Sequence, residues 1–188
     1  MWHTLFVMSG VENHVVSYLQ KQVQTFDNEV PHEIFYPTRK LVHLNHGVRT
    51  VVTRALFPGY MFIKTEEIAY FKKIMQRCTG FLTILQDADL LFETMRQDEI
   101  DAIRVLLNEF GEIEFSSGLA ENNRIRIVSG PLRNYCGRIL KINKRECRAK
   151  IHLNLLGKEI FTYVGLNALE KIEDEDIEGV RDFYFERK

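Results

Sequence analysis

Apolar positions at the start of the chain change their period at residue 9. Residues 2–8 form a short apolar and aromatic run that ends at Ser9-Gly10, which is typical of a buried strand. The following apolar residues recur at helical spacing, and Ser9 precedes Glu12 by the three residues of a capping box. These positions are Val15, Val16, Leu19, Val23 and Phe26. The pattern predicts a strand followed by an amphipathic helix.

Strand and helix patterns continue as far as residue 110. Strands are predicted at 30–36, 61–63 and 81–85, and a hairpin at 41–56 with its tip near 45–47. A second helix would bury Ile68, Phe71, Ile74 and Met75. A third would begin after Thr94 and bury Ile100, Ile103, Leu106, Leu107 and Phe110. Residues 1–110 are therefore predicted to form an α+β sandwich, with helices on a mostly antiparallel sheet.

From residue 123 the apolar period falls to two. Five short strands are predicted, at 123–127, 137–142, 147–153, 160–164 and 169–172. Short strands with little else bury a core only by curling into a small barrel, so 123–172 is predicted to be a second domain. The polar stretch 111–122 is predicted to be a linker. Residues 173–188, with seven acidic and three basic side chains and with apolar residues at helical spacing, are predicted to be an acidic tail, which we hypothesise screens the barrel.

Charge divides the chain in the same way. Residues 121–172 contain 11 Lys or Arg against 4 Asp or Glu, a net charge of +7, and the remainder contains 14 against 22, a net charge of -8. The overall charge of -1 conceals this division. A basic module on an acidic body is typical of a protein that binds a polyanion such as nucleic acid.

Several functional classes are disfavoured by what the sequence contains. Three cysteines without a C-x-x-C pair favour reduced thiols and a cytoplasmic protein, and no apolar run is long enough to span a membrane. His43 and His46 have the spacing of metal ligands but no third ligand nearby. We find no phosphate-binding loop, nucleophile elbow or acid/base constellation, so neither catalysis nor a metal or cofactor is expected. An RNA-processing enzyme is the disfavoured alternative.

A Pro-Gly turn at 57–60 places two aromatic residues between strand-like runs. Pro58 fixes its own φ, and Gly59 tolerates the positive φ that such turns demand. The turn displays Phe57 and Tyr60, which are either core residues, as most aromatics are, or a binding surface.

Two ordered sets of motifs resemble the NusG family of transcription factors. The first is Trp2, Ser9-Gly10-Val11-Glu12-Asn13, Pro37-Thr38 and Phe57-Pro58-Gly59-Tyr60, which is similar to the family's N-terminal domain. The second is Gly130-Pro131, Gly137, Leu156-Gly157-Lys158-Glu159 and Leu169-Glu170-Lys171-Ile172, which is similar to its KOW module. The resemblance covers residues 2–172. It implies a NusG-type sandwich followed by a KOW domain, a small SH3-like five-stranded β-barrel.

The resemblance also implies partners. Proteins of this family bind RNA polymerase through an apolar depression on the N-terminal domain that grips the clamp helices of the largest subunit. By likeness, the polymerase-binding residues would be Trp2, Phe57 and Tyr60, which would belong to or support that depression, and Phe81 as a further candidate. Aromatic anchors in a shallow groove hold a partner helix through buried area. Non-template DNA is a further partner left open, and a monomer is expected.

The KOW-like region departs from the usual family pattern. Leu132 and Tyr135 stand where the family has phenylalanines, and the module is more basic than is usual. These departures resemble specialised paralogues, among which the LoaP antiterminators of long operons are the most similar, and imply binding of a nascent RNA hairpin. The alternative is a general NusG-like elongation or termination factor whose KOW domain contacts Rho or the ribosomal protein NusE. A fold-switching second domain, as in the RfaH branch, also stays open.

Basic side chains of the second domain are the predicted RNA-binding residues. Lys and Arg would contact phosphates, whereas Tyr135 and Asn134 would stack on or hydrogen-bond to an unpaired base. The predicted set is Arg124, Arg126, Arg133, Asn134, Tyr135, Lys141, Lys144, Arg145, Arg148 and Lys150. The alternative is a solvated barrel surface on which these charges serve solubility.

Overall fold

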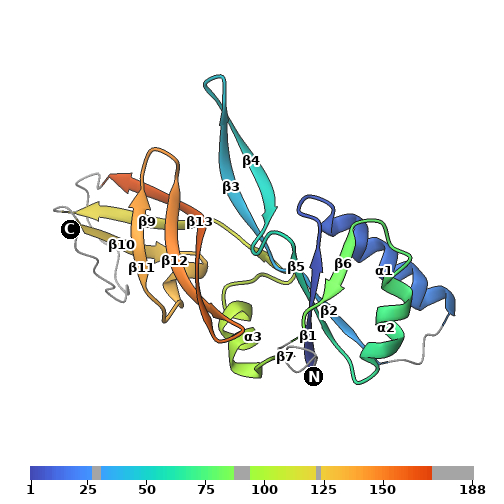
Figure 1. The fold of residues 1–188 in the computed structure, drawn as a ribbon. Helices are drawn as coiled ribbons and strands as arrows, with labels where there is room; N and C mark the ends of the chain where they lie inside the picture. Colours follow the sequence, from blue (N-terminus) through green and yellow to red (C-terminus); the bar gives the residue numbers. More distant parts are fainter. Residues whose placement is uncertain (27–30, 87–93, 122–123, 171–188) are drawn as a thin grey trace. The chain divides into compact units, whose positions relative to one another are not determined.

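The computed structural model describes residues 1–26, 31–86, 94–121 and 124–170, and these divide into two units (Figure 1). The first unit contains residues 1–37, 55–101 and 155–158. The second contains 38–54, 102–154 and the described residues from 159 onward. The predicted tail at 173–188 lies outside the described residues. The second unit therefore combines two stretches that are far apart in the sequence.

A five-stranded sheet organises the first unit. Its strands are β1 (Trp2–Val7), β2 (Glu33–Phe35), β5 (Tyr60–Lys64), β6 (Phe81–Ile84) and β7 (Thr94–Met95). The order is β2-β5-β1-β6, and β7 also pairs with β1. The pairings of β1 with β5, β6 and β7 and of β2 with β5 are all antiparallel, which confirms the predicted sheet.

Two helices cover one face of this sheet. In α1 (Glu12–Phe26) the buried Val15, Leu19 and Val23 are spaced four residues apart, so they form one stripe. In α2 (Ile68–Met75) the buried residues are Ile68, Phe71 and Met75. Both stripes pack in one cluster with the sheet residues Leu5, Val7, Met61, Ile63 and Ile84. This cluster is the core of the first unit. The spacing of its apolar residues in the sequence was sufficient to predict both helices.

The third helix is shorter than the sequence predicted. Helix α3 spans Gln97–Arg104 and buries Ile100 and Ile103. Its N-terminus is held by Glu99, whose carboxylate accepts a hydrogen bond from the Arg96 backbone N–H at 3.0 Å. Phe110, predicted on the same helical face, lies in a turn beyond the helix with 78% of its surface exposed. The prediction for Phe110 was therefore wrong.

A β-hairpin forms one part of the second unit. Strands β3 (Thr38–Asn45) and β4 (Val48–Ala55) flank a turn at His46-Gly47, in agreement with the predicted hairpin. Strand β8 (Glu112–Ile113) pairs with β3 in parallel, which gives a three-stranded sheet in the order β4-β3-β8. Most of the hairpin beyond Val42 is exposed. Its base is therefore anchored to β8, within the stretch that was predicted to be a linker.

A second five-stranded sheet forms the rest of the second unit. Its strands are β9 (Ser116–Glu121), β10 (Arg124–Ser129), β11 (Ile139–Asn143), β12 (Arg148–Leu155) and β13 (Lys158–Glu170), in the order β10-β9-β13-β12-β11. Strand β12 alternates as predicted, with Ala149, Ile151 and Leu153 buried.

Two details of the predicted strand set were wrong. The predicted linker at 111–122 supplies β9, which pairs antiparallel with β10 and parallel with β13. Residues 160–164 and 169–170, which were predicted to lie in separate strands, belong to one continuous strand, β13, which pairs with both β9 and β12. Positions 171–172 of the last predicted strand lie outside the described residues. A single long strand links the two halves of the sheet because it bonds to different neighbours along its length.

Candidate functional site

The turn at 57–60 closes between β4 and β5 as predicted. The Tyr60 N–H donates to the Phe57 carbonyl at 3.0 Å, and Gly59 has a φ of +84°. A Cβ on Gly59 would lie 3.2 Å from the Val7 carbonyl oxygen, so the site favours glycine on conformation and on space. The turn therefore fixes where Tyr60 enters the sheet.

A buried carboxylate holds this turn to the start of α1. Glu12 is 5% exposed, and its two oxygens accept hydrogen bonds from the backbone N–H groups of Gly59 at 2.9 Å and of Gly10 at 2.7 Å. The expected capping box is thus replaced by a bond to Gly10 and a long-range bond to the turn. Burial, followed by the Glu12 charge, raises the pKa of Tyr36 to about 12. Glu12 is a positioning residue whose contact with the turn was not predicted from the sequence.

Two of the predicted polymerase-binding aromatics lie in the interior. Trp2 is 3% exposed, and its ring meets Phe35 edge-on at 5.8 Å between centroids. Phe57 is 4% exposed and packs edge-on against Phe62 at 6.1 Å. The Trp2 indole N–H also donates to the Gln97 side chain at 3.2 Å. Trp2 and Phe57 support the sheet face opposite α1 and α2 and do not present a surface themselves.

Tyr60 and Phe6 are the partly exposed aromatics of that face. The two residues are direct partners across β5 and β1, and their rings lie 5.2 Å apart between centroids. Sequence reasoning missed Phe6, although its alternation with the core residues Leu5 and Val7 was a usable signal. Phe81 packs against the α1 and α2 cluster instead. The structure therefore brings Tyr60 together with Phe6 and does not bring it together with Phe81.

Strand order separates the predicted RNA-binding residues of the second unit. Arg124 and Arg126 lie on β10, at one end of the hydrogen-bonded order, whereas the residues from 141 to 150 lie on β11, β12 and the turn between them, at the other end. Arg126 is half-buried, and the side chain of Arg124 lies outside what the structure describes. Arg133 and Asn134 are exposed beside the short 3-10 helix η1 (Pro131–Arg133). No single strand pair carries the whole predicted set.

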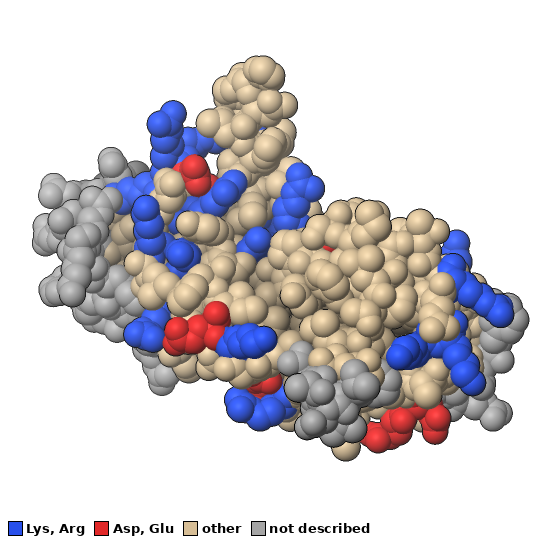
Figure 2. Space-filling view, in the orientation of Figure 1, with Lys and Arg blue, Asp and Glu red and all other residues tan. Residues whose placement is uncertain are grey.

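The β11–β12 end of the sheet carries most of the accessible positive charge of the predicted RNA-binding set. Lys141, Lys144 and Arg145 are exposed, and Lys150 is half-buried. Within the described part of the chain no carboxylate pairs with these four side chains. Figure 2 shows several Lys and Arg side chains over the visible face of this sheet, with fewer Asp and Glu among them. We call these four residues the β11–β12 cluster.

Arg148 belongs to a structural contact instead. One guanidinium nitrogen donates to the Val42 carbonyl of β3 at 3.0 Å, and another lies 3.7 Å from the Glu146 carboxylate. From β3, Arg39 donates to the Tyr163 carbonyl at 2.7 Å and to the Thr162 hydroxyl. The two arginines thus fasten the hairpin to β12 and β13.

The partly buried environment of Arg39 affects its pKa. Burial, and secondarily the charge of Arg148, lowers the pKa of Arg39 to about 10. A partly buried guanidinium is retained there because its hydrogen bonds join two elements. Arg148 was predicted to bind RNA, and its side chain is occupied within the fold.

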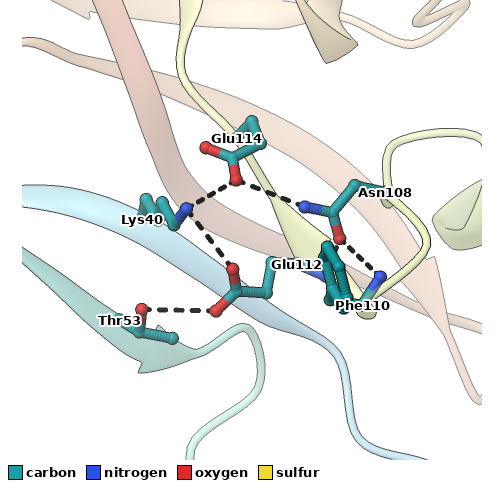
Figure 3. Close-up of polar contacts among 6 residues, drawn as sticks. All are labelled: Lys40, Thr53, Asn108, Phe110, Glu112 and Glu114. Carbon is teal, nitrogen blue, oxygen red and sulfur yellow. Dashed lines mark hydrogen bonds and ion pairs between the residues drawn. The ribbon is translucent and has the colours of Figure 1, made fainter.

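A second polar network fixes the base of the hairpin (Figure 3). The Lys40 ammonium lies 2.6 Å from the Glu114 carboxylate and 3.5 Å from that of Glu112. The Glu112 carboxylate also accepts from the Thr53 hydroxyl at 3.3 Å, and the Asn108 amide donates to Glu114 at 3.2 Å. The hydrogen bond from Lys40 to Glu114 is the main cause that raises the pKa of Lys40. Both strands of the hairpin are therefore tied to the segment at 108–114.

Tyr135 is a core residue, which contradicts its predicted role in base stacking. It is 7% exposed, and its hydroxyl donates to the His152 carbonyl of β12. Burial raises its pKa to about 12. Leu132, the other departure from the family's aromatic pattern, is 2% exposed. Both departures therefore alter the interior of the second unit.

Two exposed aromatics of β13 were missed by sequence reasoning. Phe161 and Tyr163 are 48% and 38% exposed, whereas Thr162 and Val164 between and beyond them are buried. The strict alternation of the segment was a usable signal, because alternate residues of a strand point to opposite faces.

The comparisons with known proteins identify the family. Residues 1–104 match the model of the family described as "Transcription termination factor nusG". The chain therefore belongs to the NusG family. Membership makes it a NusG-like transcription termination/antitermination factor and not an enzyme.

Relatives match along most of their length. The chain is 26% identical over 177 residues to the transcription termination/antitermination protein NusG of Halalkalibacterium halodurans, covering 91% of this chain and 98% of that protein. It is 26% identical over 167 residues to the protein of the same description from Thermus thermophilus, covering 84% and 91%. A solved structure described as "Domain interaction in Thermotoga maritima NusG" has a TM-score of 0.51 at 20% identity, over 88% of this chain and 92% of that one. The structural likeness concerns the fold.

Helix length gives one further finding. Within the described ranges, none of the helices has the length and apolar character needed to cross a lipid bilayer.

Proposed function

We propose that this chain is a processive antitermination factor of the LoaP type, which binds RNA polymerase through its first unit and nascent RNA through its second. The polymerase contact would be the aromatic face of Tyr60 and Phe6. The RNA contact would be the β11–β12 cluster on a sheet that we assign to an SH3-like KOW domain. The observation that carries the RNA half is the set of four neighbouring cations without a carboxylate partner among the described residues.

The polymerase half follows from how the sheet is covered. Helices α1 and α2 bury one face of the sheet, and the other face carries the partly exposed rings of Tyr60 and Phe6 as well as the buried Trp2. A rigid aromatic surface with a solid support binds a helical partner with little loss of side-chain freedom. The clamp helices of the largest polymerase subunit are such a partner. Holding that clamp closed would suppress pausing and extend transcription through long operons.

The RNA half follows from charge and exposure. Phosphate contacts release counterions, so accessible Lys and Arg give affinity that depends on salt. Four such side chains on one hairpin and its strands suit the backbone of a hairpin RNA, whose sequence is read mainly in its unpaired bases. A surface that served only solubility would intersperse charges of both signs.

The alternative is a general NusG-like factor whose second unit binds proteins such as Rho or NusE. The exposed Leu140 and Leu169, 47% and 53% accessible, favour it because apolar side chains at a surface suit a protein contact. The buried positions of Leu132 and Tyr135 do not separate the two functions, because neither side chain reaches the surface.

Reversing the charge of the turn tests the RNA half. In the double variant Lys144→Glu with Arg145→Glu, affinity for a leader-RNA hairpin should fall at least tenfold. The wild-type affinity should decrease with salt at a logarithmic slope of roughly -3 to -4, for about four phosphate contacts. Lys73→Glu, which changes an exposed lysine of α2, is the matched control and should bind RNA normally. A flat salt response, or equal losses in both variants, would refute RNA binding by this cluster.

A separate experiment tests the polymerase half. Tyr60→Ala with Phe6→Ala should prevent co-purification with RNA polymerase while the circular dichroism spectrum is retained. Leu82→Ala, which removes an exposed apolar side chain of β6, is the control. Retained polymerase binding in the aromatic variant would remove this face from the contact.

A further inference from the structure

The outward faces of β12 and β13 carry aromatic and basic side chains next to one another. Phe161 and Tyr163 are two residues apart on β13, so they point to the same side of the sheet. The Lys150 ammonium lies 5.2 Å from the centroid of the Phe161 ring, and the His152 ring lies 5.5 Å from it. We call these four residues the aromatic strip. The Glu159 carboxylate, 3.3 Å from His152 Nε2, lies beside it.

We infer that the aromatic strip binds unpaired nucleobases of RNA by stacking on Phe161 and Tyr163. This inference rests on the proposed RNA binding and names the part of the ligand that the second unit recognises. A base has an apolar face that stacks on an aromatic ring whatever its sequence, and the phosphate that follows needs a cation within reach. Lys150 supplies that cation on the neighbouring strand, and the exposed turn residues Lys144 and Arg145 extend the positive surface along β11–β12.

Exposure and neighbours distinguish the strip from ordinary sheet packing. Aromatic residues on sheets commonly pair across strands with other apolar side chains, which covers their rings. Phe161 instead lies beside a lysine and a histidine and keeps 48% of its surface accessible. Tyr135, the aromatic that the sequence favoured for stacking, is 7% exposed and is not available. Charge complementarity therefore favours a polyanion with flat bases over a protein partner.

Removing the rings should weaken binding of single-stranded RNA selectively. The probes are a uridine strand of about 12 nucleotides and a blunt duplex RNA with the same number of phosphates. Phe161→Ala and Tyr163→Ala should each bind the single strand about 5- to 100-fold more weakly, which corresponds to the stacking of one base, and should bind the duplex as the wild type does. An abasic strand of equal length should show no difference between variant and wild type.

Two further variants separate stacking from a structural role. Phe161→Leu keeps an apolar side chain and should lose single-strand affinity as Phe161→Ala does, whereas Phe161→Tyr keeps the ring and should retain it. Phe110→Ala removes another exposed aromatic of the same unit, which is 78% accessible, and should leave all binding unchanged. Circular dichroism establishes that each variant is folded.

The outcomes distinguish this inference from the function on which it rests. If Lys144→Glu with Arg145→Glu abolishes binding of both probes while the aromatic variants bind like the wild type, RNA binding stands and the stacking inference is wrong. If neither set affects either probe, the proposed RNA binding fails as well. Equal losses on duplex and single strand also refute stacking. A loss of Rho or NusE binding, with RNA binding intact, would show that the strip is a protein contact.

Discussion

Two pairs of aromatic residues, one pair in each unit, differ in their exposure to solvent. In the first unit Trp2 and Phe57 are almost fully buried. In the second, Phe161 and Tyr163 lie on an outward face beside Lys150 and His152. The resemblance to a known family drew attention to the first pair, whereas the second lies on a strand in which no motif was recognised. An aromatic residue in a sequence motif can therefore be a core residue. Only its exposure in the structure indicates whether its ring can contact a partner.

The largest effect that this comparison predicts is on stability. Phe57→Ala should lower the free energy of unfolding by about 3–5 kcal/mol, because it leaves a cavity against Phe62. Phe161→Ala should cost less than about 1 kcal/mol, because its ring is already half in water. Trp2 is the single tryptophan and lies in the first unit, so its fluorescence follows the unfolding of that unit in urea. Circular dichroism follows the unfolding of the Phe161→Ala variant. Equal costs would remove the distinction between the two pairs.

The next effect concerns the carboxylate that positions the turn. Glu12→Ala should destabilise the first unit by about 2 kcal/mol, because the buried N–H group of Gly59 and the partly buried N–H group of Gly10 lose their acceptor. Asn13→Ala, at the exposed neighbouring position, is the control and should cost much less. Urea denaturation followed by Trp2 fluorescence measures both. If both variants were equally stable, Glu12 would not hold the turn.

A smaller effect separates a cation that stabilises the second unit, Arg148, from one that is proposed to bind RNA, Lys144. Arg148→Ala should lower stability by about 1 kcal/mol, because the bond to Val42 is lost from a side chain that is still 28% exposed. Its RNA affinity should change less than that of Lys144→Ala, whose side chain is exposed. Thermal denaturation and RNA titration of the two variants give the comparison. The reverse ranking would restore Arg148 as an RNA contact.

The last predicted effect is alkaline, is absent at neutral pH and occurs in both units. Tyr36 in the first and Tyr135 in the second have pKa values raised to about 12, mainly by burial, against about 10 in an unfolded chain. Both tyrosines stabilise the fold fully below about pH 10, and this stability is lost as the pH rises towards about 12. Phenolate absorbance should show late-titrating tyrosines, and Tyr36→Phe and Tyr135→Phe should each remove one. A titration completed near pH 10 would contradict the burial of both.

Sequence reasoning succeeded where one local signal decided the structure. The stripe of Val15, Leu19 and Val23 predicted α1, and Pro58-Gly59 predicted the turn, because period and backbone freedom act within a few residues. It failed at 116–121, where Ser116-Ser117-Gly118 has the composition of a loop but pairs with β10 and β13. Strand pairing between distant segments overrides local preference, because backbone hydrogen bonds and side-chain packing with the neighbouring strands decide the outcome.

The sequence predicted which types of residue the candidate sites contain but not which of those residues are exposed. Charge counting found the basic module, but strand order separated Arg126 from the β11–β12 cluster, and the hairpin occupied Arg148. Resemblance pointed to Trp2, Phe57 and Tyr60, and burial left only Tyr60 of these three at the surface, next to Phe6. Sequence gives the residue types available to a site, whereas exposure depends on the segments that pack over them.

By itself the sequence determined the amphipathic helices, the Pro-Gly turn and the concentration of positive charge in residues 121–172, because each depends on neighbouring residues or on composition. Only the tertiary structure decided which rings and cations face water. In the sequence alone, Tyr135 and Phe161 look equally suited to stacking on a base. In the structure, Tyr135 is buried and donates a hydrogen bond to the His152 carbonyl, whereas Phe161 is exposed beside Lys150. The difference comes from long-range strand pairing, which no local pattern encodes.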